Sequence, residues 1–106
     1  MNSKPPKHYR RLKKTHPEFI ASWEAISKAV RDTGPLPSKT GHLIQLAAAA
    51  AVRSEGAVHS HVRRLLELKA KPAEIHQAIM LTAATIGFPA VMAALSWADD
   101  ILESRR

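Results

Sequence analysis

The sequence predicts an all-α protein of about five helices, and three observations support this fold class. Apolar residues recur at intervals of three and four along most of the chain, and no segment shows sustained alternation bounded by hairpin turns. Prolines and glycines divide the chain into segments of helical length. The 106 residues suffice for one domain, and a hydrophobic content of 45% is too high for a disordered chain.

The first two helices are expected on either side of a proline-rich connector. The segment Thr15–Glu18 offers an N-cap hydroxyl, a proline in the first turn and an acid at the third position, which are typical of a helix start. This helix stops at Asp32–Pro35, and its apolar side chains are Phe19, Ile20, Trp23, Ile26 and Val30. After the stiff stretch Pro35–Pro37, Ser38 is a candidate cap for a second helix, which continues through an alanine-rich run to Ala51.

Three further helices are expected in the second half of the chain. Ser54 can start the third helix, which ends near Leu68. The fourth opens at Pro72 with Glu74 at its third position, and Gly87–Pro89 breaks it. Its apolar face holds Ile75, Ala78, Ile79, Thr82 and Ala83. The last helix begins at Pro89 or Ala90 and carries Val91, Met92, Leu95 and Ile101, with Trp97 on a flank.

The positive charge is concentrated at the N-terminus. Lysine and arginine number 16 against 9 acids, which gives a net charge of +7. The acid-free first 14 residues contain Lys4, Lys7, Arg10, Arg11, Lys13 and Lys14. We therefore expect a basic N-terminal arm over residues 1–14 and a nearly neutral helical domain over residues 15–106. A solvated basic tail is favoured over phosphate contacts, so binding of nucleic acid is not expected.

Cysteine is absent, which excludes disulfides, thiolate metal sites and thiol redox chemistry. No apolar run reaches the roughly 18 residues of a membrane span, and no signal peptide is visible. We therefore expect a cytoplasmic protein without membrane attachment. The GxSxG motif of many serine hydrolases is also missing.

The densest polar cluster runs from Ser54 to His61. At about 100° per residue, His61 lies on the apolar face of the third helix, while Glu55 and His59 share a neighbouring stripe. A helix N-terminus suits a carboxylate or enolate, which a histidine on the buried face could protonate. Two simpler interpretations remain open: an N-cap serine with a core histidine, and a surface pair of Glu55 with His59.

Metal binding is not expected from the spacing of the candidate ligands. The available donors are His42, His59, His61, His76 and Glu55. No two histidines have the HxxxH spacing that places two imidazoles on one ion, and His59 and His61 point about 200° apart on a helix.

Four motifs in order resemble the carboxymuconolactone decarboxylase family, which includes the alkylhydroperoxidase D-like proteins. They are Leu43–Ala51, Ser54–Arg63, Pro72–Ile75 and Gly87–Ala90 with Ala93–Leu95, and the resemblance covers roughly residues 15–104. It implies an alkylhydroperoxidase D-like helical bundle that assembles as a homo-trimer or homo-hexamer, with active sites near the subunit contacts. Trp97 and Met92 are then candidate interface residues.

Family peroxidases use a Cys-x-x-Cys pair followed by a histidine, with a glutamate further upstream. On this chain the cysteine positions hold Ser54 and Ala57, the histidine is His61, and the glutamate position holds His42. Only the histidine is kept, so thiol peroxidase activity by that route is excluded. The decarboxylase branch also lacks the cysteine pair and keeps the histidine. Its reaction removes a carboxylate from an unsaturated lactone and leaves a dienolate that must be reprotonated.

The resemblance therefore implies a cofactor-independent small-molecule enzyme of the decarboxylase (lyase) or isomerase type. Its expected catalytic residues are His61 as proton donor, Glu55 as an assisting group and Ser54. The expected substrate-binding residues are His42, His59 and Ala57, in a mostly apolar pocket around Ser54 and His61 that a second subunit closes. The alternative is a non-catalytic family member that acts as a binding or assembly protein, since the glutamate and both cysteines are lost.

Two departures from the family concern stability. Relatives commonly carry Gly-Ala-Thr-Pro before the fourth helix, where this chain has Lys69–Pro72. Lys71 lacks an acceptor for the helix N-cap, a loss of about 1 kcal/mol. Lys69 is expected to take the left-handed conformation that glycine adopts without strain.

Overall fold

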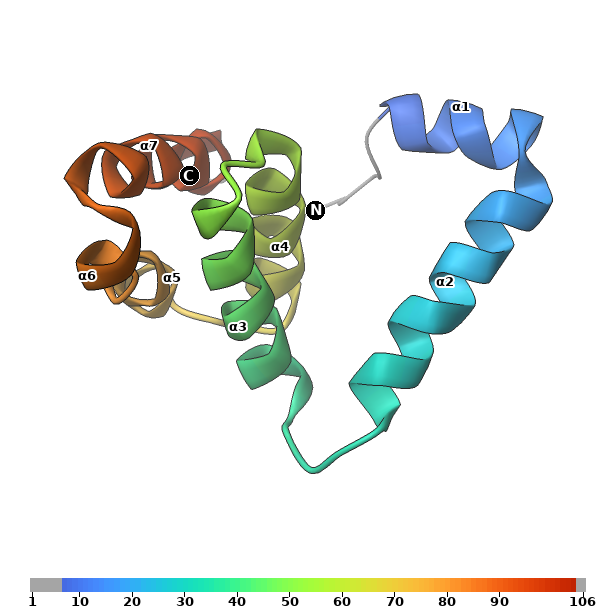
Figure 1. Cartoon of the computed structure of the whole chain (residues 1–106), viewed down its shortest axis with the longest axis horizontal. Coiled ribbons are helices and arrows are strands. Elements are labelled where there is room, and N and C mark those ends of the chain that lie inside the picture. Colours follow the sequence, from blue (N-terminus) through green and yellow to red (C-terminus); the bar gives the residue numbers. More distant parts are fainter. Residues whose placement is uncertain (1–6, 105–106) are drawn as a thin grey trace. The chain divides into compact units, whose positions relative to one another are not determined.

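The computed structural model describes residues 7–104, and within this range the chain forms seven helices and no strand (Figure 1). The prediction of an all-α protein is therefore confirmed. The chain divides into two compact units, one ending at Leu36 and the other beginning at Pro37. None of the helices within residues 7–104 combines the length and the hydropathy that crossing a membrane requires.

The first unit contains α1 (Lys7–Thr15) and α2 (Pro17–Asp32), which pack against each other. Residues 7–14 of the expected basic arm are thus helical, and the expected boundary between residues 14 and 15 falls inside the last turn of α1. The Tyr9 hydroxyl donates to Glu24 Oε2, and Lys13 Nζ lies 3.5 Å from the same oxygen. This hydrogen bond to Glu24 raises the pKa of Tyr9 to about 12. The cation expected at Lys4 lies outside the described residues.

The start of α2 differs from the sequence prediction. The N-cap position is His16, which makes no side-chain cap, so the assignment of Thr15 as the cap was wrong. Thr15 instead ends α1, where its hydroxyl donates to the carbonyl of Arg11 at 3.1 Å. Only Ile20 of the α2 apolar set is buried. The others form an exposed apolar stripe made of Phe19, Trp23, Ile26 and Val30.

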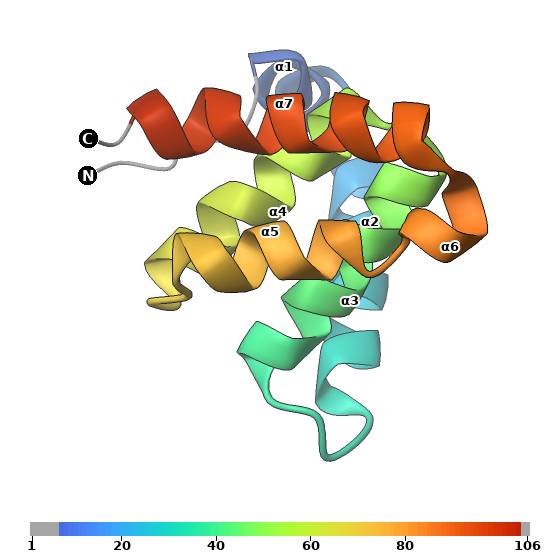
Figure 2. The ribbon, with the colours of Figure 1, turned by 90° about the vertical axis from the view of Figure 1, so that its left-hand side faces the viewer.

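The second unit contains α3 (Ser38–Ala51), α4 (Glu55–Glu67), α5 (Pro72–Met80), α6 (Ala83–Ile86) and α7 (Phe88–Ser104). Helix α4 packs against both α3 and α7, and α7 also lies along α5 (Figure 2). The fully buried large side chains of this unit are Leu46, Val58, Val62, Leu65, Ile75 and Ile79. Small buried residues such as Ala94 and Ala98 line α7, which brings its backbone close to its neighbours.

Helices α3 and α4 end in the same way, with a residue in the left-handed conformation. At the end of α3, Arg53 has a φ of 58°, and the next amide, that of Ser54, donates to Ala49 O at 3.0 Å. At the end of α4, Lys69 has a φ of 67°, and the amide of Ala70 donates to Leu65 O at 2.9 Å. Both are Schellman motifs, in which glycine is the usual left-handed residue. The prediction for Lys69 is confirmed.

The predicted fourth helix is interrupted between α5 and α6. The Thr82 hydroxyl donates to Ile79 O at 2.6 Å, and its amide bonds the same carbonyl at 3.0 Å, which tightens the chain into a turn. At the start of α5, Lys71 is the N-cap residue without a side-chain acceptor, as predicted, and Glu74 Oε1 accepts from the Lys71 amide at 2.9 Å. Gly87, with a φ of 89°, then separates α6 from α7.

Candidate functional site

The second unit brings two histidines together on the facing sides of α3 and α4. His42 is 5% exposed and lies on the buried stripe of α3, one turn before Leu46. His61 is partly buried on α4, next to buried Val62. Their Nδ1 atoms are 3.1 Å apart, their ring centroids are 5.3 Å apart, and the ring planes are tilted by 49°. We call these two residues the histidine pair.

The short connection between α3 and α4 places this pair. Only three residues, 52–54, separate the two helices, and the Schellman turn at Arg53 reverses the chain so that α4 packs back along α3. Ser54 then caps α4, because its Oγ accepts a hydrogen bond from the amide of Ala57 at 3.3 Å. The interpretation of Ser54 as an N-cap is thus confirmed. Ser54 lies two turns before His61, about 10 Å along the helix axis, so the structure does not bring the two together.

The electrostatics of the histidine pair favour an uncharged His61 ring. At 3.1 Å between Nδ1 atoms one ring donates and the other accepts, so the neutral pair combines opposite tautomers. Burial lowers the pKa of His61 to about 4, and the charges of His42 and Arg64 act in the same direction. His61 is therefore neutral at pH 7.

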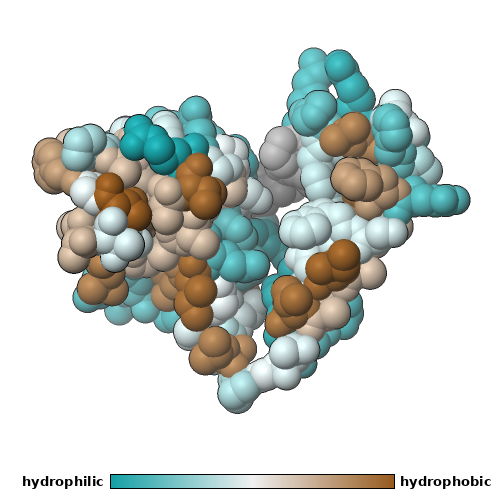
Figure 3. All heavy atoms as spheres, viewed as in Figure 1, coloured by the Kyte–Doolittle hydropathy of each residue, from teal (hydrophilic) through white to brown (hydrophobic). Residues whose placement is uncertain are grey.

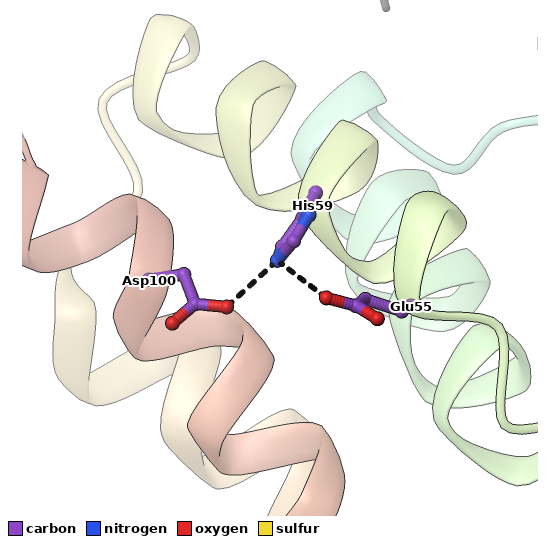
Figure 4. A group of neighbouring side chains, drawn as sticks. All are labelled: Glu55, His59 and Asp100. Carbon is purple, nitrogen blue, oxygen red and sulfur yellow. Dashed lines mark hydrogen bonds and ion pairs between the residues drawn. The ribbon is translucent and has the colours of Figure 1, made fainter.

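The remaining candidate residues of α4 belong to a different cluster. His59 Nε2 lies 3.0 Å from Asp100 Oδ2 of α7 and 3.9 Å from Glu55 Oε2, as Figure 4 shows. The spacing of Glu55 and His59 in the sequence indicated their contact, whereas Asp100 is 41 residues from His59 and was missed. The neighbouring Asp99 makes a similar contact, with its Oδ1 atom 2.7 Å from His76 Nε2. Ala57, the last of the expected substrate-binding residues, is half-buried beside the cap of Ser54.

A large open cavity of about 620 Å³ lies elsewhere in the second unit. It is formed by α3, α5 and the segment around α6, and its apolar lining includes Leu43, Ile44, Ala47, Ala78, Leu81 and Ile86. The polar residues along its lining are Thr40, Glu74, Gln77, Thr82 and Thr85. Its lining contains neither Ser54 nor His61, around which a pocket was expected. The cavity and the histidine pair therefore use different faces of α3.

One further residue near the pair in sequence was not singled out by its pattern. Gln45, three residues after His42, lies on a neighbouring stripe of α3. Its Oε1 is buried and, within the described residues, lacks a hydrogen-bond partner. A buried acceptor without a donor costs about 1 to 3 kcal/mol of stability.

Comparisons with known proteins agree with this architecture. A family model described as "Carboxymuconolactone decarboxylase family" matches residues 17–100. The structure is similar to the crystal structure of an apo carboxymuconolactone decarboxylase family protein from Legionella pneumophila. That similarity has a TM-score of 0.82 and 24% sequence identity, and it covers 93% of this chain and 88% of the other. None of the curated proteins matches the chain. Because the family model spans most of its length, this protein belongs to the carboxymuconolactone decarboxylase family.

Proposed function

We propose that this chain is a cofactor-independent small-molecule enzyme whose acid–base chemistry takes place at His61, with His42 as its proton partner. The observation that carries the proposal is the histidine pair itself, in which a buried imidazole lies 3.1 Å from a second one. Two imidazoles at this distance can hold and pass one proton. Family membership supports a small-molecule substrate, and the absence of cysteine excludes a thiol peroxidase.

The low pKa of His61 shapes the order of the steps. In the resting protein the ring is neutral, so a proton must reach it before it can act as an acid. A substrate carboxylate bound beside the pair supplies a negative charge, which raises the pKa of His61 and lets the two rings share one added proton. The added proton comes from solvent water, and the bound carboxylate only makes its uptake by the pair favourable.

In a decarboxylation, the bond between the carboxylate carbon and the substrate breaks, carbon dioxide leaves, and the electron pair remains as a dienolate. The proton held by the pair then goes to the dienolate carbon, and His61 returns to its neutral form. In an isomerisation, neutral His61 first accepts a proton from carbon and afterwards returns it to another carbon. Both routes use the same ring, and both need no metal or organic cofactor.

The neighbouring residues receive different roles from those expected. Glu55 and His59 contact each other and Asp100, so we assign the role of assisting group to His42 rather than to Glu55. Ser54 caps the first turn of α4 and thereby helps to fix the position of His61 along the helix.

The test is proton exchange into small carboxylic acids. We would incubate the protein in D₂O with a panel of unsaturated lactones and keto acids, and follow loss of carbon-bound protons and release of carbon dioxide by NMR. The wild-type protein should catalyse one of these reactions, and His61→Asn and His42→Asn should reduce the rate at least about 100-fold. His76→Asn, which removes a histidine outside the pair, should leave it unchanged. A panel without any His61-dependent reaction would refute the proposal.

One observation favours the alternative of a non-catalytic binding protein. The cavity of about 620 Å³ has the size of a small-molecule site but is not lined by His61. If the chain is a binding protein, a ligand found by screening should be lost on Ala47→Trp, which fills the cavity, and retained in His61→Asn. The enzyme proposal expects the reverse, loss of turnover on His61→Asn.

We propose further that the chain assembles with itself as a homo-trimer or homo-hexamer. The exposed apolar stripe of α2 supports this, since Phe19, Trp23 and Ile26 are each more than half exposed. Brown, hydrophobic side chains lie at the surface over α2 in Figure 3. Met92 on α7 is also half exposed, whereas Trp97 packs partly against the core. Light scattering after size exclusion should give three or six times the 11.6 kDa of the chain. Trp23→Glu should lower that mass, and a monomeric wild-type protein would refute the assembly.

A further inference from the structure

The cluster of Glu55, His59 and Asp100 has the make-up of a metal site. Each residue offers one ligand atom, and the three atoms lie within 4.8 Å of one another. Within residues 7–104 this is the only group of three or more such side chains. Figure 4 shows the His59 ring between the two carboxylates, with its Nε2 facing both of them.

Packing fixes the central ligand of this cluster. His59 lies on α4 where that helix packs against α7, and its side chain is only 21% exposed. The carboxylates of Glu55 and Asp100 are more than half exposed, so they can adjust around an ion while the imidazole stays in place. The site thus combines one oriented nitrogen with two adaptable oxygens.

The donor set and its spacing suit a zinc ion. Zinc binds imidazole nitrogen and carboxylate oxygen at about 2.0 to 2.2 Å, so neighbouring ligand atoms of a tetrahedral site lie about 3.3 Å apart. The 3.0 Å between His59 Nε2 and Asp100 Oδ2 is close to that separation, and the 3.9 Å to Glu55 Oε2 needs a small rotation of an exposed side chain. Two carboxylates beside a neutral imidazole balance the charge of a divalent ion.

From this arrangement we propose that Glu55, His59 and Asp100 bind one zinc ion that bridges α4 and α7. Three protein ligands leave a fourth tetrahedral position for water. The sequence spacing indicated no metal site because the third ligand comes from a helix 41 residues away. The site is separate from the histidine pair, because His59 and His61 point about 200° apart on α4. The zinc proposal therefore does not depend on the proposed reaction.

The chain itself offers a matched control for this site. His76 and Asp99 form a second histidine–aspartate contact at 2.7 Å, also made to α7, but no third ligand completes it among the described residues. A variant of His76 therefore removes a similar imidazole and a similar contact without touching the proposed ligands. The control separates specific coordination from general binding of zinc by surface histidines.

The experiment titrates the full untagged chain with zinc chloride and measures binding by calorimetry. A parallel titration uses cobalt(II) as a spectroscopic probe. We expect one equivalent of zinc to bind, a rise in Tm with zinc, and the visible absorption of four-coordinate cobalt. His59→Ala should weaken zinc binding at least tenfold and abolish the Tm rise, while His76→Ala should bind as the wild type does.

A second variant keeps the test valid if His59→Ala disturbs folding. Asp100→Asn preserves size and removes one charged ligand, and the helical content of each variant would be checked by circular dichroism without metal. Loss of zinc binding in both Asp100→Asn and His59→Ala supports the site. Absence of binding by the wild type, or binding that persists in Asp100→Asn and disappears in His61→Asn, overturns it.

Discussion

The depressed pKa of His61 makes stability at mildly acid pH a direct test of the histidine pair. Because the pKa falls from 6.5 in the unfolded chain to about 4 in the folded protein, the unfolded state binds the proton first. The stabilisation is therefore complete above pH 6.5 and is lost as the pH falls from 6.5 to 4. Each pKa unit corresponds to about 1.36 kcal/mol, which gives about 3 kcal/mol for the full shift.

Solvent screening reduces this figure, because the His61 ring is only partly buried, and we expect a loss of about 2 kcal/mol. The assay is urea unfolding of the wild type and of His61→Asn at pH 7, 5.5 and 4.5. Glu74 and Asp32 also have lowered pKa values, so their contribution to stability is lost at still lower pH. Both residues are present in both proteins, so their effect cancels in the comparison. Equal pH dependence in the two proteins, or an NMR titration of His61 near pH 6.5, would refute the close, desolvated pair.

Three further predictions concern the supports of the site, each measured as the free energy of unfolding in urea at pH 7. Lys69→Gly should stabilise the protein by about 0.5 to 1 kcal/mol. A left-handed residue other than glycine costs about 1 to 2 kcal/mol, and the greater conformational entropy that glycine loses on folding cancels part of this gain. Lys69→Ala is the control and should have little effect. Ser54→Ala should destabilise by about 1 kcal/mol through loss of the hydrogen bond to Ala57, and Ser54→Asn should restore it. Leu65→Ala should cost about 2 to 5 kcal/mol, because this side chain is fully buried, and a cost below 1 kcal/mol would contradict the described core.

Local patterns predicted most of the second unit. Capping and apolar spacing located α4 from its serine cap, and the missing glycine at Lys69 indicated a left-handed residue that the structure contains. The split between α5 and α6 was missed, since Thr82 lies on the apolar face and the competition of its hydroxyl with the helix is visible only in three dimensions. Local hydrogen bonding of a threonine is too weak a signal to override a helical pattern.

In the first unit, charge indicated the composition of the N-terminal arm but not its structure. Residues 7–14 contain five cations, and they form a helix without a buried residue that contacts α2. The contact of Tyr9 with Glu24 spans 15 residues, so no local pattern contains it. Tyr9 stands alone among cations, so the sequence showed no periodic apolar pattern that would have indicated this packing.

The candidate site was predicted by residue type but not by arrangement. His42 and His61 were both identified, yet their distance depends on the turn at Arg53 and on the angle at which α3 and α4 pack. The acids Asp99 and Asp100 received no role from the sequence. Their partners, His76 and His59, lie on other helices, and contacts across helices cannot be obtained from spacing along one.

The three-residue connection after α3 also restricts how the length of this chain can vary. The amides of Arg53 and Ser54 both bond carbonyls of the last turn of α3, and Ser54 simultaneously begins the next helix, so neither residue can shift without releasing one of these bonds. A single insertion or deletion there would change the register of the whole of α4 against α3 and move one imidazole away from the other. Natural length variation is therefore expected outside residues 49–61.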